Sequence, residues 1–286
     1  MMKKTKKLVV LFAAVMFTLS VGLAGCAPKE ETIEIGYVNW ACATANTHLV
    51  KVILEDEFDV NVNIRDMEAG LMWQSLETKD LDFMVTAWLP GTHANYYAAV
   101  KDSVEDLGPL YEGAAIGLVV PEYVTIDSIE ELNENADKFE GQIVGIDAGA
   151  GIMGAAETAL TEYGLTDMEL LTSGDAAMTA ELQRAYENEE WVVVTGWAPH
   201  WKFAKFDLKF LEDPKNVFGG EETINVMARD DFSAEKPEIA DFLSSIFLTP
   251  AQLGELIGVV SEADDMEQAA RDWIEDNRDL VDGWLS

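Results

Sequence analysis

Residues 192–197 read VVVTGW, a short run of mostly β-branched residues that ends in a tryptophan. A run of this kind, followed by turn residues, is typical of a buried strand in an α/β sheet. Two further runs have the same form, IEIGYVNW at residues 33–40 and FMVTAW at residues 83–88. Ligands of open α/β sheets bind beyond the carboxyl ends of the strands. We therefore expect Trp40, Trp88 and Trp197 to meet in one aromatic box.

A box of three indole rings has a specific chemical use. A quaternary ammonium group has no N–H to donate, whereas the faces of indole rings attract it by about 0.5–2 kcal/mol each. We therefore expect the three strand-end tryptophans to bind a ligand cation. The remaining five lie at the start of a strand or in and beside helices, where packing is the simpler role: Trp73, Trp191, Trp201, Trp273 and Trp284.

Strands and helices alternate along most of the chain, which predicts an α/β fold with mainly parallel sheets flanked by helices. The predicted strands cover residues 33–40, 60–67, 83–88, 115–120, 143–147, 169–172, 192–196 and 223–228. The predicted helices cover residues 47–57, 71–78, 129–135, 153–163 and 176–188, and the segment 237–284 is mainly helical.

Two breaks interrupt this alternation, Pro121 and the glycine pair at residues 219–220. They predict a middle lobe, residues 121–221, inserted into an outer lobe made of residues 33–120 and 222–286. A crevice between two lobes is a natural site for a small ligand. Because the three tryptophans divide between the lobes, we expect the box to be complete only when the lobes close.

A glycine-rich loop, GAGIMG at residues 149–154, follows a predicted strand and opens a predicted helix. Glycines at a helix N-terminus expose backbone N–H groups, which attract anions. We expect this loop to bind a ligand carboxylate. Two alternatives stay open, because the loop also matches the G-x-G-x-x-G dinucleotide fingerprint and can equally be a structural turn. His93, five residues after Trp88, either donates to the same carboxylate or is a surface histidine.

The first 25 residues are organised like a bacterial lipoprotein signal peptide. Four lysines precede an apolar segment, residues 8–21, which is short for a membrane span, and Leu23-Ala24-Gly25-Cys26 follows directly. We expect cleavage before Cys26, lipidation of that cysteine and a tether over residues 26–32. The alternative is an ordinary secretory signal with an incidental cysteine. The lipoprotein interpretation predicts an exported protein that acyl chains hold at the cell membrane.

The chain is strongly acidic. It has 53 acidic and 19 basic residues, a formal net charge of −34, and removal of the four signal lysines changes this to −38. A field of this sign repels nucleic acid and anionic lipid head groups. The acidic surface keeps an exported protein soluble, or it is an adaptation to a salty medium.

The residue patterns of common catalytic and metal sites do not occur. If Cys26 carries lipid, Cys42 has no intramolecular partner, and the three histidines lack metal-type spacing. No G-x-S-x-G motif is found, and no pair of carboxylates stands out from the acidic background. We therefore expect binding without catalysis, with no cofactor and no metal ion.

At these residues the chain closely resembles the glycine betaine/proline betaine substrate-binding proteins of osmoprotectant ABC importers. The resemblance covers residues 33 to at least 249. The sequence around Cys42 departs from that of relatives, which bears on fine selectivity. Four motifs carry the resemblance: YVNW at 37–40, AWLPGTH at 87–93, GIDAGAGIM at 145–153 and VTGWAPHW at 194–201.

The resemblance implies a two-lobed periplasmic-binding-protein fold, the Venus-flytrap arrangement, with the ligand cleft between the lobes. It also implies a three-tryptophan cage for the trimethylammonium group, and a carboxylate clamp of two backbone N–H groups and a histidine. The implied partners are a membrane permease and its cytoplasmic ATPase. The matching positions are Trp40, Trp88 and Trp197 for the cage and Gly151, Ile152 and His93 for the clamp.

The sequence thus predicts an extracytoplasmic, lipid-anchored receptor that captures glycine betaine, and also proline betaine, for osmoprotectant uptake. One alternative keeps the cage but changes the ligand to choline or carnitine, and a choline receptor would not depend on a carboxylate clamp. A third hypothesis, a dinucleotide-dependent oxidoreductase, rests on residues 149–154 alone.

Overall fold

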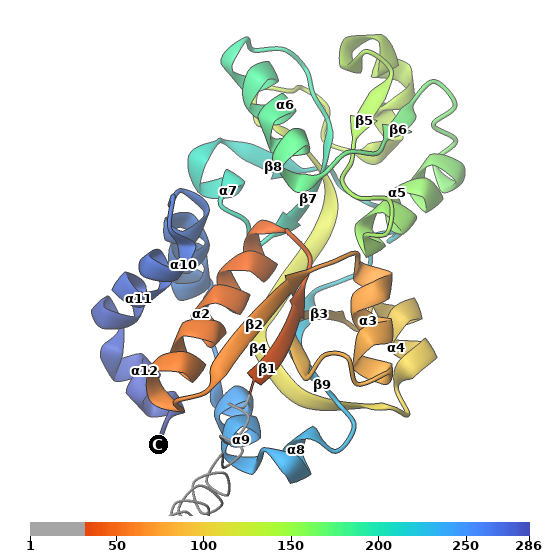
Figure 1. Cartoon of the computed structure of the whole chain (residues 1–286). Helices are drawn as coiled ribbons and strands as arrows, with labels where there is room; N and C mark the ends of the chain where they lie inside the picture. Colours follow the sequence, from red (N-terminus) through yellow and green to blue (C-terminus); the bar gives the residue numbers. More distant parts are fainter. Residues whose placement is uncertain (1–31) are drawn as a thin grey trace, which may run out of the picture. The chain divides into compact units, whose positions relative to one another are not determined.

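A mixed β-sheet positions the residues of interest (Figure 1). The computed structural model describes residues 32–286, so the predicted signal peptide, Cys26 and most of the predicted tether lie outside the described residues. The strands are ordered β2-β1-β3-β9-β4-β7-β5-β6, with β8 paired to β4. Their bounds are Thr32–Tyr37 (β1), Asn61–Asp66 (β2), Phe83–Leu89 (β3), Val104–Pro121 (β4), Gln142–Val144 (β5), Glu169–Leu171 (β6), Val194–Ala198 (β7), Leu208–Phe210 (β8) and Glu222–Arg229 (β9).

The predicted α/β class is confirmed, but the sheet is mixed where mainly parallel pairing was expected. Strand β1 runs parallel to β3, and β5 runs parallel to β6 and β7. Strand β9 lies antiparallel between β3 and β4, and β7 and β8 also pair antiparallel with β4. The order of elements along the chain does not reveal that β9 lies between β3 and β4, because β9 follows β3 by more than 130 residues.

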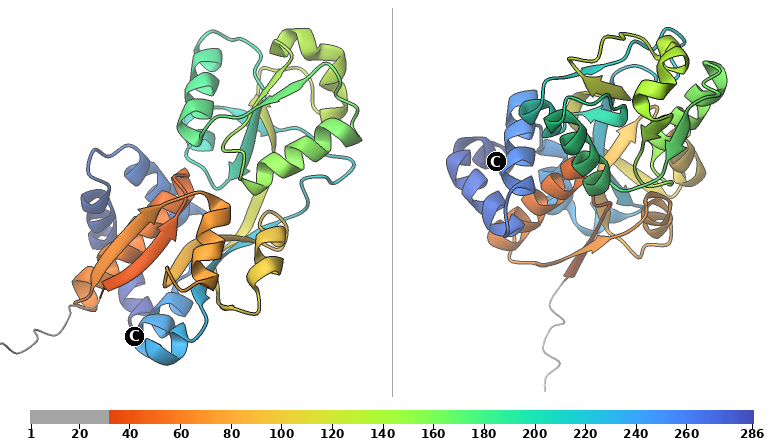
Figure 2. Two further views of the ribbon diagram at one scale, coloured as in Figure 1. Left: turned by 45° about the vertical axis from the view of Figure 1, so that its right-hand side comes forward. Right: turned by 90° about the horizontal axis from the view of Figure 1, so that it is seen from above.

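Strand β4 joins the two groups of strands (Figure 2). Its first part, from Val104 to Ala114, pairs with β9, and its last part, from Ala115 to Val119, pairs with β7. The register sets Ile116 of β4 opposite Trp197 of β7. The one strand β4 therefore pairs with β9 along its first part and with β7, which contains Trp197, along its last part.

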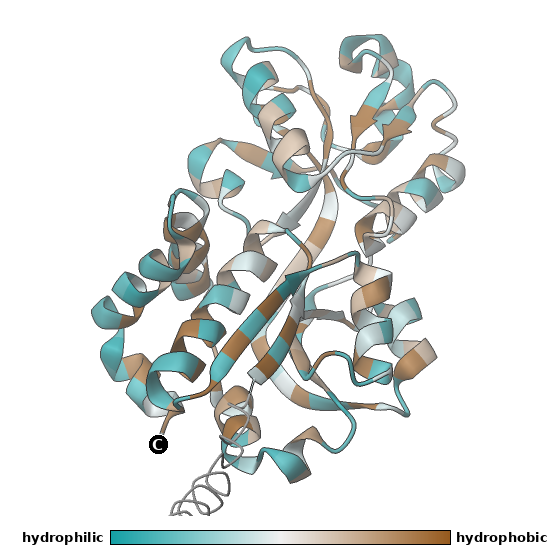
Figure 3. Cartoon of the chain, viewed as in Figure 1, coloured by the Kyte–Doolittle hydropathy of each residue, from teal (hydrophilic) through white to brown (hydrophobic). Residues whose placement is uncertain are grey.

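Helices surround these strands, and hydrophilic residues concentrate on helices such as α11, while hydrophobic residues concentrate along the strands (Figure 3). Helix α2 is the exception, since its residues 42–54 are all buried. It packs against β2, β3, α10 and α11, as expected of a helix covered on every side. The helix bounds are Ala41–Glu57 (α2), Ala69–Glu77 (α3), Ala94–Val100 (α4), Gly151–Glu162 (α5), Asp175–Glu187 (α6), Lys202–Lys205 (α7), Phe232–Glu235 (α8), Pro237–Ser245 (α9), Pro250–Ser261 (α10), Met266–Asp276 (α11) and Arg278–Trp284 (α12).

Several element boundaries differ from the predicted ones. Helix α2 begins six residues before the predicted start, because Trp40 ends the extended segment as the helix N-cap. The predicted helix 129–135 is instead two 3-10 segments, Ile129–Glu131 and Asn133–Phe139. Helix α4 and strand β8 were not predicted, since both are short.

The predicted lobe boundaries, residues 121–221 against the remainder, stay a prediction. Residues 33–286 form one compact unit. No single helix among residues 32–286 is long and apolar enough to span a membrane, although α9 and α10, which are bent by 108° at their junction, meet the length and composition criteria as a pair.

Candidate functional site

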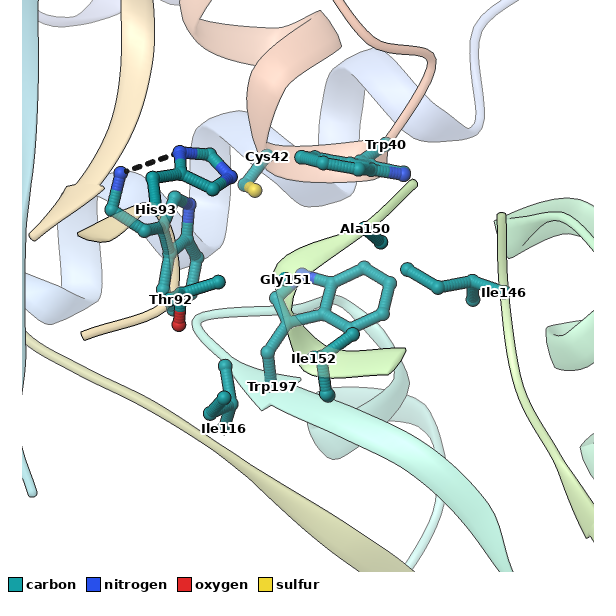
Figure 4. Close-up of a pocket in the computed structure, with 11 residues that line it drawn as sticks. Trp40, Cys42, Thr92, His93, Ile116, Ile146, Ala150, Gly151, Ile152 and Trp197 are labelled. Carbon is teal, nitrogen blue, oxygen red and sulfur yellow. Dashed lines mark hydrogen bonds between the residues drawn. The ribbon is translucent and has the colours of Figure 1, made fainter. Parts of the chain in front are cut away.

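One cavity is lined by all six residues that the sequence predicts to bind ligand (Figure 4). They come from four separate places: the start of α2, the end of β3 with the loop after it, the start of α5, and β7. Cys42, Thr92, Ile116, Ile146 and Ala150 complete the lining. Among these eleven residues there is no aspartate, glutamate, lysine or arginine, so the wall carries no formal charge.

The three tryptophans reach the cavity from positions that the strands fix. Trp88 is the sixth residue of β3, whose seven residues are all buried, and Trp197 is the fourth residue of β7. Trp40 lies three residues beyond β1 and precedes the first residue of α2. The three residues are only 3–6 % exposed. Their indole rings therefore form much of the wall, and Figure 4 shows Trp40 and Trp197 on two sides of the cavity.

Two carboxylates hold the start of α2 from elements far along the chain. The Trp40 indole Nε1 donates to Asp147 Oδ2 at 3.1 Å, and the Ala41 backbone N–H donates to Asp175 Oδ2 at 3.0 Å. The Asp147 contact fixes the orientation of the Trp40 ring. The Asp175 contact places a negative charge at a helix N-terminus, where the helix dipole favours it.

Helix α5 begins at the cavity without a side-chain cap. Its N-cap residue is Ala150, whose methyl group cannot accept a hydrogen bond. The first N–H groups of any helix have no partner within the helix, and here these belong to Gly151 and Ile152, which both line the cavity. The helix start therefore offers backbone donors and a positive dipole end to an anionic group.

Gly151 is required by a close approach. A Cβ atom at this position would lie 2.0 Å from the Thr92 carbonyl oxygen. The absence of a side chain lets the first turn of α5 pack directly against the loop after β3. This contact brings the N–H groups of α5 and the side chain of His93 to the same cavity.

His93 is a buried, neutral hydrogen-bond donor. Its Nδ1 accepts a hydrogen bond from the Trp88 backbone N–H at 3.1 Å, so the ring proton is assigned to Nε2. That Nε2 atom is buried and has no hydrogen-bond partner among the described residues. Burial lowers the pKa of His93 to about 4, so the ring is uncharged at neutral pH. An oxygen atom of a ligand would satisfy the free N–H.

A buried glutamate fixes the loop that carries His93. Glu222 accepts hydrogen bonds from the backbone N–H groups of Gly91 and Thr92, at 3.1 and 2.9 Å, and from the Thr92 hydroxyl at 2.6 Å. The Tyr96 hydroxyl in α4 donates to the Gly149 carbonyl oxygen at 2.7 Å. The loop after β3 and the glycine loop therefore meet in one defined geometry.

The sequence did not identify every part of this site. Ile116 and Ile146 lie in or beside strands and carry no chemical signature. Cys42 was noted for its lack of an intramolecular partner and for a departure from relatives, and not as a residue of the site. The supporting carboxylates Asp147, Asp175 and Glu222 were hidden in the acidic background of the chain. The position of Asp147 as the last residue of a predicted strand was the one signal that could have identified it.

The site brings three indole rings and three hydrogen-bond donors, two backbone N–H groups of α5 and His93 Nε2, to one uncharged cavity. It can hold a cation that lacks N–H groups beside the indoles and a carboxylate beside the donors of α5 and His93. Among residues 32–286 no group of three or more histidine, cysteine, aspartate or glutamate side chains is placed to hold a metal ion.

Solved structures with this fold include two of related sequence. The chain superposes on the lactococcal glycine betaine-binding protein, in its closed form with glycine betaine, with a TM-score of 0.84, 35 % identity and coverage of 90 % of this chain and 100 % of that one. A glycine betaine/L-proline-binding protein from Borrelia burgdorferi gives a TM-score of 0.85 and 34 % identity, with coverage of 90 % and 97 %. A choline-binding protein in complex with choline, 24 % identical, shares the fold with a TM-score of 0.82.

Sequence comparison leads to the same group of proteins. The chain is 43 % identical over 173 residues to the glycine betaine/carnitine transport binding protein of Listeria monocytogenes, a match that spans 60 % of this chain and 56 % of that relative. The family model for the substrate-binding domain of ABC-type glycine betaine transport systems matches residues 31–276. The chain therefore belongs to the family of substrate-binding domains of ABC-type glycine betaine transport systems.

Proposed function

We propose that this protein captures glycine betaine, and also proline betaine, for an osmoprotectant ABC importer. The observation that carries the proposal is the pairing of two kinds of group in one uncharged cavity. Three indole rings line it together with the first N–H groups of α5 and the unpartnered Nε2 of a neutral histidine. A betaine needs both kinds of group, because it carries a methylated ammonium and a carboxylate.

The proposed roles divide between the two ends of the ligand. Trp40, Trp88 and Trp197 surround the ammonium, and each indole contributes roughly 0.5–2 kcal/mol. At the other end, hydrogen bonds from Gly151, Ile152 and His93 to a carboxylate contribute roughly 1.5–3 kcal/mol each, since one partner is charged. After the cost of ordering the ligand is subtracted, these contributions are enough for the binding free energy of ~8 kcal/mol that a micromolar site requires.

The wider assignment follows the sequence. Cys26 is the lipid attachment site, and the mature protein stays outside the cytoplasm at the cell membrane. It delivers ligand to a membrane permease driven by a cytoplasmic ATPase. The lobes are residues 33–120 with 222–286 and residues 121–221. The cage then joins Trp40 and Trp88 of one lobe to Trp197 of the other.

Titration calorimetry with glycine betaine tests the ligand assignment. We expect a saturable heat at sub-millimolar ligand, and its absence would refute the proposal. Choline and carnitine are the informative competitors, because choline has the same head group but no carboxylate. Choline that binds as tightly as glycine betaine, with an affinity that His93→Ala leaves unchanged, would replace betaine by choline as the ligand. Binding of NAD would revive the oxidoreductase alternative.

A further inference from the structure

A lysine is completely buried behind one of the cage rings. Lys202, the first residue of α7, is 0 % exposed, and its Nζ lies 4.1 Å from the centroid of the Trp197 ring. This Nζ has no hydrogen-bond partner among residues 32–286. Lys202 does not line the cavity, whereas Trp197 does. Trp197 therefore belongs to the cavity wall and also faces the Lys202 amine.

The charged and titratable groups around Lys202 come from three elements. Asp175 of α6 accepts hydrogen bonds from His200 Nε2 at 3.1 Å and from the Ala41 N–H at 3.0 Å. Burial opposes ionisation of Asp175, but its contacts with His200, Lys202 and the Ala41 N–H hold its pKa below the usual range. Cys42 of α2 also faces the amine, and burial raises its pKa to about 12. Of these groups Asp175 is therefore the anion near Lys202 at neutral pH. Its carboxylate also accepts hydrogen bonds from His200 and the Ala41 N–H.

Lys202 is the member of this cluster that changes charge near neutral pH. Burial lowers its pKa to about 7, against an opposing effect of Asp175 and Cys42. Burial and the nearby lysine lower the pKa of His200 to about 4. Burial also lowers the pKa of His93 to about 4. Between pH 5.5 and 8.5 the histidines beside the cavity therefore stay neutral, Asp175 stays ionised, and Lys202 titrates.

We propose that the Lys202 ammonium and a bound quaternary ammonium compete for the two faces of the Trp197 ring, so that ligand capture releases a proton from Lys202 to the solvent. This inference rests on the proposed function of the cavity. A ring that already faces one cation attracts a second one less, and the two cations repel each other through it. Capture is therefore strongest when Lys202 is neutral and weakens as the pH falls below neutrality.

The separation of the charges sets the size of the effect. With Lys202 4.1 Å from the ring centroid and the ligand about as far on the other side, the two charges are about 8 Å apart. At an effective dielectric constant of about 20, partly offset by Asp175, their repulsion is roughly a tenfold effect on affinity. By linkage, the dissociation constant rises about eightfold from pH 8.5 to pH 5.5, and about half a proton is released per ligand near pH 6.5.

Titration calorimetry of the full mature protein with glycine betaine measures both quantities. Repeating the titration in phosphate and in Tris at pH 6.5 gives the number of protons released, because the two buffers differ in ionisation heat. Lys202→Met keeps an unbranched side chain against Trp197 without the charge. We expect it to bind with the same affinity at pH 5.5 and 8.5 and to release no proton. Lys205→Met, in the same helix and outside the cavity lining, is the matched control and should behave like the wild type.

The inference would be overturned if the wild-type affinity stayed constant within twofold from pH 5.5 to 8.5 and the binding heat did not differ between the two buffers. That result would leave the proposed function intact. The same pH dependence in Lys202→Met as in the wild type would also overturn it. If the wild-type protein binds no betaine at any pH, the proposed function fails and this inference fails with it. The buffer comparison on the wild type tests the proton release even if Lys202→Met does not fold.

Discussion

Replacing Gly151 by alanine should abolish betaine binding without unfolding the protein. The new Cβ would lie 2.0 Å from the Thr92 carbonyl oxygen, 2.6 Å from its Cγ2 and 2.8 Å from its carbonyl carbon. An ordinary contact needs about 3.4 Å or more. The first turn of α5 must therefore move away from Thr92 by about 1.4 Å, which is the difference between the 3.4 Å of an ordinary contact and the 2.0 Å to the carbonyl oxygen.

This displacement falls on the backbone N–H groups that are proposed to bind the ligand carboxylate. A hydrogen bond of about 2.9 Å that lengthens by this amount is lost. Losing two N–H donors to a carboxylate costs roughly 3–6 kcal/mol, or a factor of about 10² to 10⁴ in affinity. The helix itself tolerates the change, because alanine is a better helix former than glycine. Folding and binding are therefore expected to separate in this variant.

Gly154→Ala is the matched control for this prediction. Gly154 lies in the same helix, and a Cβ there meets nothing within 4 Å. We expect this variant to bind like the wild type and to be about 0.5–1 kcal/mol more stable. Calorimetry gives the affinities, and thermal melts with and without glycine betaine give the ligand-induced shift of the midpoint. If Gly151→Ala binds within threefold of the wild type, the contact between α5 and Thr92 does not position the clamp.

Three further predictions concern the cage, acid stability and the charged surface. Trp88→Ala should weaken binding of glycine betaine at least tenfold in calorimetry, and unchanged affinity would remove Trp88 from the site. Because the pKa of His93 is lowered to about 4 in the folded protein, the unfolded chain binds more protons between pH 6.5 and 4, so stability falls as the pH drops through this window. Over that window the free energy of unfolding of His93→Gln, measured by denaturant titration, should fall by roughly 1–3 kcal/mol less than that of the wild type. An equal fall in the two proteins would contradict the burial of His93. With a formal net charge of −34, the protein should melt at a higher temperature in molar salt than in dilute buffer, because salt screens repulsion between its carboxylates. An unchanged melting temperature would argue against salt adaptation.

The meeting of the three tryptophans at one cavity could be predicted because local signals mark their positions. Trp88 and Trp197 end buried β-branched or aromatic runs, and the glycine loop at residues 149–154 opens a helix directly after a strand. A buried parallel strand ends at the ligand-binding edge of a sheet whatever its neighbours are. The sequence could therefore predict that these side chains meet at one cavity even though the order of strands in the sheet was not known; their binding of a ligand stays a prediction.

Contacts between distant segments could not be predicted in the same way. Asp147 lies 107 residues from Trp40, and Asp175 lies 134 residues from Ala41. Their approach depends on β9 entering the sheet antiparallel between β3 and β4, and on β4 continuing through 18 residues to pair with β7. Pairings of that kind are decided by packing across the whole sheet, and no local period encodes them. Lys202 was missed for a related reason, since its burial depends on the rings and helices around it.

Residues that line the cavity, together with a neighbour just outside it, also join the segments around it. Trp40 donates to Asp147, Gly151 lies against Thr92, and Tyr96 holds the glycine loop. A ligand that bridges the indoles and the start of α5 adds binding energy only when these contacts are in place, and it therefore stabilises the arrangement in which they form. If the predicted lobes move, ligand binding favours lobe contact by the same free energy by which lobe contact favours ligand binding. Weakening one contact outside the cavity, such as the Tyr96 hydroxyl by Tyr96→Phe, should then lower affinity although Tyr96 does not line the cavity.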